Sequence, residues 1–186
     1  MDVYENCPIL ETDCFLIRRI EEQDAEDLLE VYSDLNALPF FNSDNCHGSN
    51  FYIPKLLDMK NTIKYWLLEY FETKGFVRFS ILNKSSGVCI GTIEMFHRIA
   101  TDAYNHCGVL RLDLSSDYEK ERYIKEIVSL VLYPFFEWFS CEKIITKAAN
   151  YAVERINALK SCGFLLSEEP LQGKDRMYYD YWTKVK

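Results

Sequence analysis

The alternation of hydrophobic and polar positions predicts both strands and helices in the first part of the chain. Apolar and basic residues over Phe15–Ile20 indicate a strand. Apolar residues then recur at helical spacing over Ala25–Leu35, and again over Ile63–Phe71, where we expect the helix to end before Gly75. Residues 39–54 lie between the two helices and are rich in Asn, Ser, Asp and Gly, which is typical of a long loop.

The middle of the chain shows the shorter period of strands. Segments 76–82 and 88–96 flank the turn-forming residues 83–87, so the pattern predicts a β-hairpin. Over Val109–Leu114, leucines alternate with charged residues, which places the leucines on one face of a third strand.

The clearest helix follows this third strand. Apolar residues recur at helical spacing from Ile124 to Trp138, and Ser116–Glu119 ahead of them is a capping-box sequence. Pro134 predicts either a kink in the last turns or the end of this helix.

The end of the chain returns to short elements. We expect a strand at 143–148, a helix over Ala152–Leu159 closed by Gly163, and two last strands at Leu165 and 178–182. The complete order predicts a mixed α/β (α+β) fold without a doubly wound pattern.

Composition adds limits on size and partners. The chain has 186 residues, of which 48% are hydrophobic and 27% charged, which fits one folded domain over residues 1–186. A formal net charge of −8 and a pI near 5.0 argue against a nucleic-acid partner, because such proteins need a basic face. The sequence shows no bilayer-spanning apolar run and no secretory signal, so we expect a cytoplasmic protein without a membrane partner.

The seven cysteines are scattered and form no CxxC pair. Cys46–His47 and His106–Cys107 come nearest to a ligand cluster, but neither is a chelating pattern. We therefore expect free thiols in a reducing compartment and no metal site.

Four phrases carry a resemblance to a known family, in the expected order across nearly the whole chain. They are Leu10–Ile20, Asp24–Leu29, Gly91–Ile93 and Leu159–Phe164. Together they resemble the GNAT-superfamily N-acetyltransferases, closest to the branch that includes the ribosomal-protein N-terminal acetyltransferases.

The resemblance implies a GNAT-like fold and a cofactor. A twisted mixed sheet would splay between its fourth and fifth strands, here Val109–Leu114 and Lys143–Ala148, with about four helices around it and acetyl-CoA in the gap. On this basis we expect cofactor-binding residues on the fourth strand and at the start of the long helix. They are Leu112, Leu114, Lys120, Glu121, Arg122, Tyr123 and Ile124.

Two segments depart from the family's pattern. The pyrophosphate loop has an Arg or Gln before Gly-x-Gly, and here those positions are Glu119, Lys120 and Arg122. Carboxylates at a helix start repel phosphates, while the basic side chains could hold them, so a cofactor loop and a solvent-facing helix start both stay open. Before Gly163, the family's Asn and Ser are replaced by Ala152 and Arg155.

The candidate catalytic residues are Glu94 and His106. Burial in an apolar strand would raise the pKa of Glu94 toward that of a general base, although a pair with Arg98 or a solvent-facing position is an alternative. His106 precedes the fourth strand, where some members of the superfamily keep their base, and is otherwise an ordinary loop residue.

The loop between the first two helices contributes to acceptor recognition in this family. Its aromatic and polar residues predict either a flexible loop or a cleft for an amine, with Phe41, Asp44 and His47 as candidate substrate-binding residues.

Three hypotheses for the function follow. The first is transfer of an acetyl group from acetyl-CoA to a primary amine of a small molecule or of a peptide or protein N-terminus, by direct attack in a ternary complex. The second is a non-catalytic GNAT-fold binding or regulatory module that has lost ordinary acetyl-CoA binding. The third is a structural or dimerisation domain, and a homodimer stays open under each of them.

Overall fold

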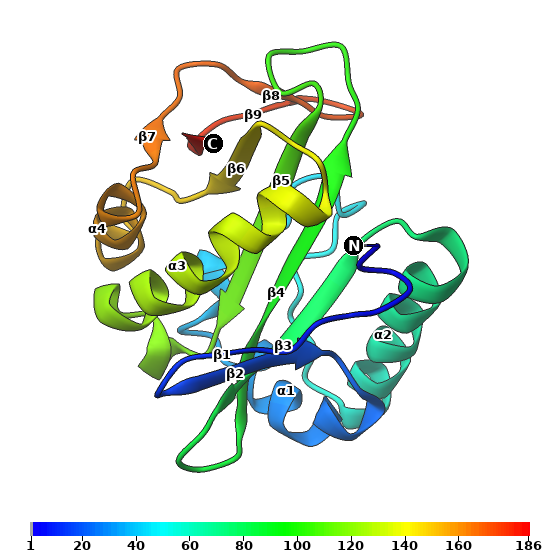
Figure 1. Ribbon diagram of the computed structural model, residues 1–186. Helices are drawn as coiled ribbons and strands as arrows, with labels where there is room; N and C mark the ends of the chain where they lie inside the picture. Colours follow the sequence, from blue (N-terminus) through cyan, green and yellow to red (C-terminus); the bar gives the residue numbers. More distant parts are fainter. Residues whose placement is uncertain (1) are drawn as a thin grey trace.

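The computed structural model describes residues 2–186 and contains one large sheet with helices on both faces (Figure 1). The eight strands of the sheet lie in the order β1-β2-β3-β4-β5-β6-β10-β7, and β8 pairs with β9 in a separate two-stranded sheet. The strands are β1 Leu10–Glu11, β2 Phe15–Arg19, β3 Val77–Asn83, β4 Cys89–Arg98, β5 Cys107–Leu114, β6 Lys143–Lys147, β7 Leu165–Leu166, β8 Leu171–Gln172, β9 Met177–Tyr178 and β10 Tyr181–Val185. The α-helices are α1 Ala25–Tyr32, α2 Leu56–Leu68, α3 Glu121–Trp138 and α4 Val153–Ser161. Short helical turns are η1 Glu22–Asp24, η2 Leu38–Phe40, η3 Glu69–Thr73 and η4 Ser116–Tyr118.

The two faces of the sheet differ in chemistry. Phe79, Ile93 and Leu112 lie on the face that packs against α3 and form the main apolar core. The intervening residues of the same strands face α1 and α2, and several of these are buried and polar or charged, namely Arg78, Ser80, Thr92, Glu94 and Asp113. Because successive side chains of a strand point to opposite faces, the sheet has one apolar face and one polar face.

The sheet splays between β5 and β6, as the resemblance implied. The two strands pair in parallel only over Gly108–Leu110 of β5, whereas β5 continues to Leu114. The carbonyl and amide groups on this edge of β5 beyond Leu110 consequently have no strand partner from β6.

Most of the predicted elements are confirmed, but the predicted last strand at 178–182 is divided between β9 and β10, which belong to different sheets. Three further differences concern the helices. Helix α2 begins at Leu56, earlier than predicted, because Leu56 and Met59 extend its apolar stripe toward the N-terminus. Helix α3 continues through Pro134 to Trp138, since burial of Phe135 and Phe136 offsets the lost hydrogen bond.

The predicted capping box is the third difference, and that prediction is wrong. Residues Ser116–Tyr118 form a separate turn, and α3 begins at Glu121 after Lys120, whose side chain makes no capping hydrogen bond. The C-terminal signal of α4 is confirmed, because Gly163 has a φ of +81° and Phe164 N–H donates to Leu159 O.

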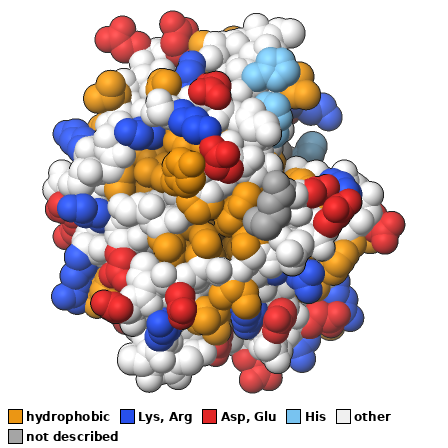
Figure 2. All heavy atoms as spheres, in the orientation of Figure 1, with side chains coloured by type: hydrophobic (Ala, Val, Ile, Leu, Met, Phe, Trp, Pro, Cys, Tyr) orange, Lys and Arg blue, Asp and Glu red, His pale blue; other side chains and the backbone are white. Residues whose placement is uncertain are grey.

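Acidic and basic side chains are interspersed over the face of the molecule shown in Figure 2. Hydrophobic side chains gather near the middle of the same face. Within residues 2–186, no helix is long and apolar enough to cross a bilayer.

Candidate functional site

The gap between β5 and β6 is crossed by the side chain of Arg155, at the start of α4. Its Nη1 donates to Leu112 O over 2.8 Å, and its Nε and Nη2 each donate to Glu119 over 2.7 Å. Arg155 is 3% exposed and Glu119 5% exposed. A buried, bidentate ion pair thus occupies the backbone edge that the splay leaves open.

The surroundings of Arg155 favour its charged form. Burial by itself would lower the pKa of Arg155, but attraction and hydrogen bonding from Glu119 raise it above its ordinary value. Separating the two groups would leave a charge buried without a partner, which costs about 3–5 kcal/mol.

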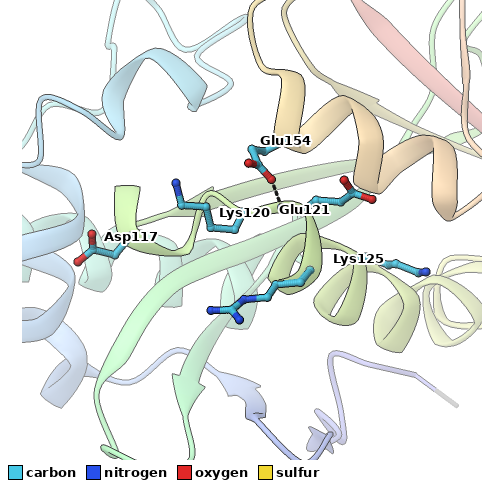
Figure 3. A pocket seen from close by; sticks show the side chains of 6 residues that line it. Asp117, Lys120, Glu121, Lys125 and Glu154 are labelled. Atoms are coloured by element: carbon cyan, nitrogen blue, oxygen red, sulfur yellow. Dashed lines mark hydrogen bonds between the residues drawn. The ribbon is translucent and has the colours of Figure 1, made fainter.

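A side chain of the protein itself also occupies the N-terminus of α3. The carboxylate of Glu154 accepts a hydrogen bond from Glu121 N–H over 2.7 Å, drawn as the dashed line in Figure 3. The cavity around this contact has a volume of about 590 Å³ and is lined by three acidic and three basic side chains. They are Asp117, Glu121, Glu154, Lys120, Arg122 and Lys125. An anionic side chain therefore already sits where a helix start would bind a phosphate.

These contacts test whether the residues present fit acetyl-CoA. A cofactor arm in the gap would have to displace Arg155 from Leu112 O, and its pyrophosphate would have to displace Glu154 from α3. The bulky residues Lys120 and Arg122 further crowd the approach to the backbone, since glycines are what allow phosphates close to it. In this arrangement, the side chains of Arg155, Glu154, Lys120 and Arg122 do not fit acetyl-CoA.

A larger cavity of about 650 Å³ opens on the polar face of the sheet, next to the gap. On its lining, Arg78 of β3, Glu94 of β4 and Arg111 of β5 form a row across three strands, because Arg78 pairs with Glu94 and Glu94 with Arg111 in the strand registers. Cross-strand neighbours of opposite charge stabilise one another at this separation. We call these three residues the charged row.

The first half of the charged row is fully satisfied. Arg78 donates twice to Glu94 Oε2, and its Nη1 donates to Thr92 Oγ1 over 2.9 Å and to Tyr32 Oη over 3.0 Å. Its guanidinium carbon lies 4.0 Å from the centre of the Trp66 ring. Beneath it, Asp113 has its pKa raised, chiefly because burial removes water from the carboxylate.

The loop between α1 and α2 is fastened over the gap by Asp44. The Asp44 carboxylate accepts hydrogen bonds from Lys147 Nζ at 2.7 and 2.9 Å and from Tyr181 Oη at 3.1 Å. The Asp44 carbonyl accepts from Arg111 Nη2 over 3.0 Å. This contact set links the loop to β5, β6 and β10, and a cavity of about 260 Å³ lies between the loop and the start of α4.

With this geometry in place, the chain can be compared with solved structures. It matches a ribosomal-protein-S5-alanine acetyltransferase from Vibrio fischeri at 16% identity with a TM-score of 0.69, over 96% of each chain. It matches a GNAT-family acetyltransferase from Bacillus anthracis at 15% identity and a TM-score of 0.68, over 96% of this chain and 98% of that one. It also matches Mycobacterium smegmatis RimJ in complex with CoA-disulfide at 13% identity and a TM-score of 0.69, over 95% of this chain and 84% of that one. The fold is that of the GNAT acetyltransferases. The sequence itself matches no family model and no curated protein.

Within the GNAT fold, the predicted cofactor residues separate into two groups. Leu112 and Leu114 lie on the splayed part of β5, and the Leu112 carbonyl faces the gap because it accepts from Arg155. Their amides point the same way, as the N–H and C=O of one strand residue do.

The predicted residues of the helix start lie around the N-terminus of α3. Lys120, Glu121 and Arg122 line its cavity, whereas Ile124 is buried in the core below it. Tyr123 packs against the core and accepts a hydrogen bond from Arg122 Nη2 over 2.6 Å.

The predicted catalytic residues lie apart. Glu94 is buried on the charged row and lines the large cavity, and its partners are Arg78 and Arg111 rather than Arg98. His106 precedes β5 at the end that pairs with β6, about 20 Å along the strand from Leu112. Its ring centre lies 5.5 Å from that of His97. The structure therefore does not bring His106 together with Glu94.

The predicted substrate residues are divided between two cavities. Phe41 and Asp44 line the smaller one, and His47 lines the larger one. Phe41 packs against Tyr32 with ring centres 5.2 Å apart. Within residues 2–186, no group of three or more His, Cys, Asp or Glu side chains could hold a metal ion.

Several residues that shape the site were absent from the predicted set of site residues, among them Arg78, Arg111, Glu154 and Arg155. A signal existed for two of them, since Arg78 is a lone charge within an apolar strand and Arg155 departs from the family's pattern. Glu154 carried no signal in the sequence, because its role depends on how α3 and α4 pack.

Proposed function

We propose that this protein is a ligand-binding or regulatory module with the GNAT fold that has lost ordinary acetyl-CoA binding. One observation above all supports the proposal: the Glu119–Arg155 pair and its bond to Leu112 O fill the gap where the cofactor would enter. The large cavity beside the gap is then the binding site, and a cytoplasmic location is supported by the seven cysteines, which are all free.

A GNAT-type N-acetyltransferase is the second candidate. It is supported by an acceptor-side cavity of about 650 Å³ and by solved structures of similar fold that hold CoA. Its acceptor would be a primary amine of a small molecule or of a peptide or protein N-terminus. For this function, Arg155 would have to leave the gap before the cofactor entered.

Calorimetric titration of the full chain with acetyl-CoA and with CoA separates the two candidates. The binding module predicts no saturable heat at millimolar cofactor, because binding must first break a buried ion pair. Micromolar binding would overturn the proposed function and support the second candidate.

The same titration has an internal control. If acetyl-CoA binds, replacing Lys120 and Arg122 by Ala should weaken affinity at least about tenfold, since both side chains line the cavity at the α3 N-terminus. Lys160→Ala, on the exposed side of α4, should leave affinity unchanged.

A further inference from the structure

The second half of the charged row has unused hydrogen-bonding capacity. Both bonds from Arg78 end on Glu94 Oε2, whereas Glu94 Oε1 faces Arg111 Nη1 at 3.4 Å. Charge-assisted bonds of this kind are normally about 2.7–2.9 Å long, so this pair is loosely held. Among the described residues, Arg111 Nε is buried without any hydrogen-bond partner.

Glu94 and Arg111, which both line the large cavity, therefore carry an acceptor and a donor that lack full partners. A buried donor without a partner costs about 1–3 kcal/mol, which a ligand carboxylate on Arg111 would recover. A ligand ammonium beside it would complete the hydrogen bonding of Glu94 Oε1. Since the ligand would bring one charge of each sign, the net charge of the row would not change.

The rest of the cavity is suited to an apolar group. Several aromatic side chains line it, among them Phe51 of the loop, Tyr65 and Trp66 of α2, Phe76 just before β3, and Phe96 of β4. The guanidinium of Arg78 already covers the Trp66 ring. Its guanidinium carbon lies 5.7 Å from the centre of the Phe51 ring, and that of Arg111 lies 5.6 Å from the centre of the Phe96 ring. A volume of about 650 Å³ accommodates a small molecule with a phenyl-sized side chain.

We propose that this cavity binds a free α-amino acid with an apolar or aromatic side chain. Its carboxylate pairs with Arg111, its ammonium with Glu94, and its side chain lies against Phe51 and Phe96. The inference rests on the proposed function only in taking this cavity as the ligand site, and it requires no cofactor.

The test uses three probes that differ in charge, titrated into the full chain without any CoA. They are L-phenylalanine, L-phenylalaninamide, which lacks the carboxylate, and N-acetyl-L-phenylalanine, which lacks the ammonium. We expect phenylalanine to bind most tightly and each analogue to bind at least about tenfold more weakly, because each loses one charge-assisted pair. Equal affinity of phenylalanine and either analogue, or no saturable binding of any probe at millimolar concentration, would overturn the inference.

A variant then assigns the carboxylate to its partner. Arg111→Gln should bring phenylalanine and phenylalaninamide to within about twofold of each other, and Arg176→Gln, an exposed arginine outside the cavity, should preserve their difference. A difference that survives in folded Arg111→Gln would exclude Arg111. If that variant does not fold, the probe series on the unaltered chain still decides, and its result is separate from the acetyl-CoA titration.

Discussion

At the scale of single residues, Asp102 shows how one carboxylate can fasten two distant segments. It accepts two hydrogen bonds from Arg98 at 2.5 and 2.7 Å, and further bonds from the backbone amides of Tyr104 and Gln172. The bonds from Arg98 are the largest cause that lowers the pKa of Asp102 to about 2. The charged form of Asp102 therefore stabilises the folded state.

We expect Asp102→Asn to lower the free energy of unfolding by about 2 kcal/mol at pH 7. Because the folded-state pKa is below the ordinary value of 3.8, this stabilisation is complete above about pH 4–5 and is lost as the pH falls toward 2. Urea unfolding of both proteins between pH 2 and 7 should show the difference closing at the acid end. Asp175→Asn, at an exposed position, is the control, and a difference that does not change with pH would contradict this assignment.

The charged row shows which properties of a single residue can be predicted from the sequence and which cannot. The sequence left two alternatives open for Glu94, burial in an apolar strand or a solvent-facing position, and Glu94 is buried. Its partners were not predicted, because Arg78 and Arg111 reach it through the strand registers on either side. A register depends on loop lengths and on which faces are buried, so it does not follow from any one strand.

At the scale of elements, the packing of α4 beside the start of α3 brings together two residues that depart from the family's pattern, and they form an ion pair. Glu119 and Arg155 are 36 residues apart, and each stands where the family has a different residue. Sequence periodicity predicted both helices, but it placed Glu119 in a capping box. The carboxylate instead pairs with Arg155, because a buried guanidinium offers two charge-assisted bonds where a backbone amide offers one.

A double-mutant cycle tests this contact. Arg155→Ser and Glu119→Gln should each destabilise the protein by about 3–5 kcal/mol, since each leaves the other group buried without its full partner. The double variant should lose clearly less than the sum of the two. Urea unfolding at neutral pH measures all four proteins, and additive losses would show that the two side chains do not stabilise each other.

At the scale of the whole molecule, the sheet consists of two parts with a narrow junction. Strands β1 to β5 form an antiparallel ladder, and β6, β10 and β7 form a second one. The parallel pairing of Gly108–Leu110 with β6 is short, so side chains supply much of the connection. The resemblance predicted where the sheet opens, but not the side chains that close the opening, because each of those contacts joins segments far apart in the sequence.

Asp44 links the loop over the gap to both parts of the sheet. Its carboxylate binds Lys147 of β6 and Tyr181 of β10, and its backbone carbonyl binds Arg111 of β5. Asp44→Ala removes the two carboxylate contacts and should therefore loosen β6 and the loop over the gap without loosening β3 and β4, which pair with each other over Val77–Leu82. Amide hydrogen exchange should show about 10- to 100-fold faster exchange in β6 and unchanged exchange in β3, because only openings that separate the two parts become easier. Asp58→Ala, an exposed aspartate on α2, is the matched control. Faster exchange throughout the sheet would mean that Asp44 stabilises the whole domain, and unchanged exchange in β6 would mean that the short parallel pairing holds the junction without it.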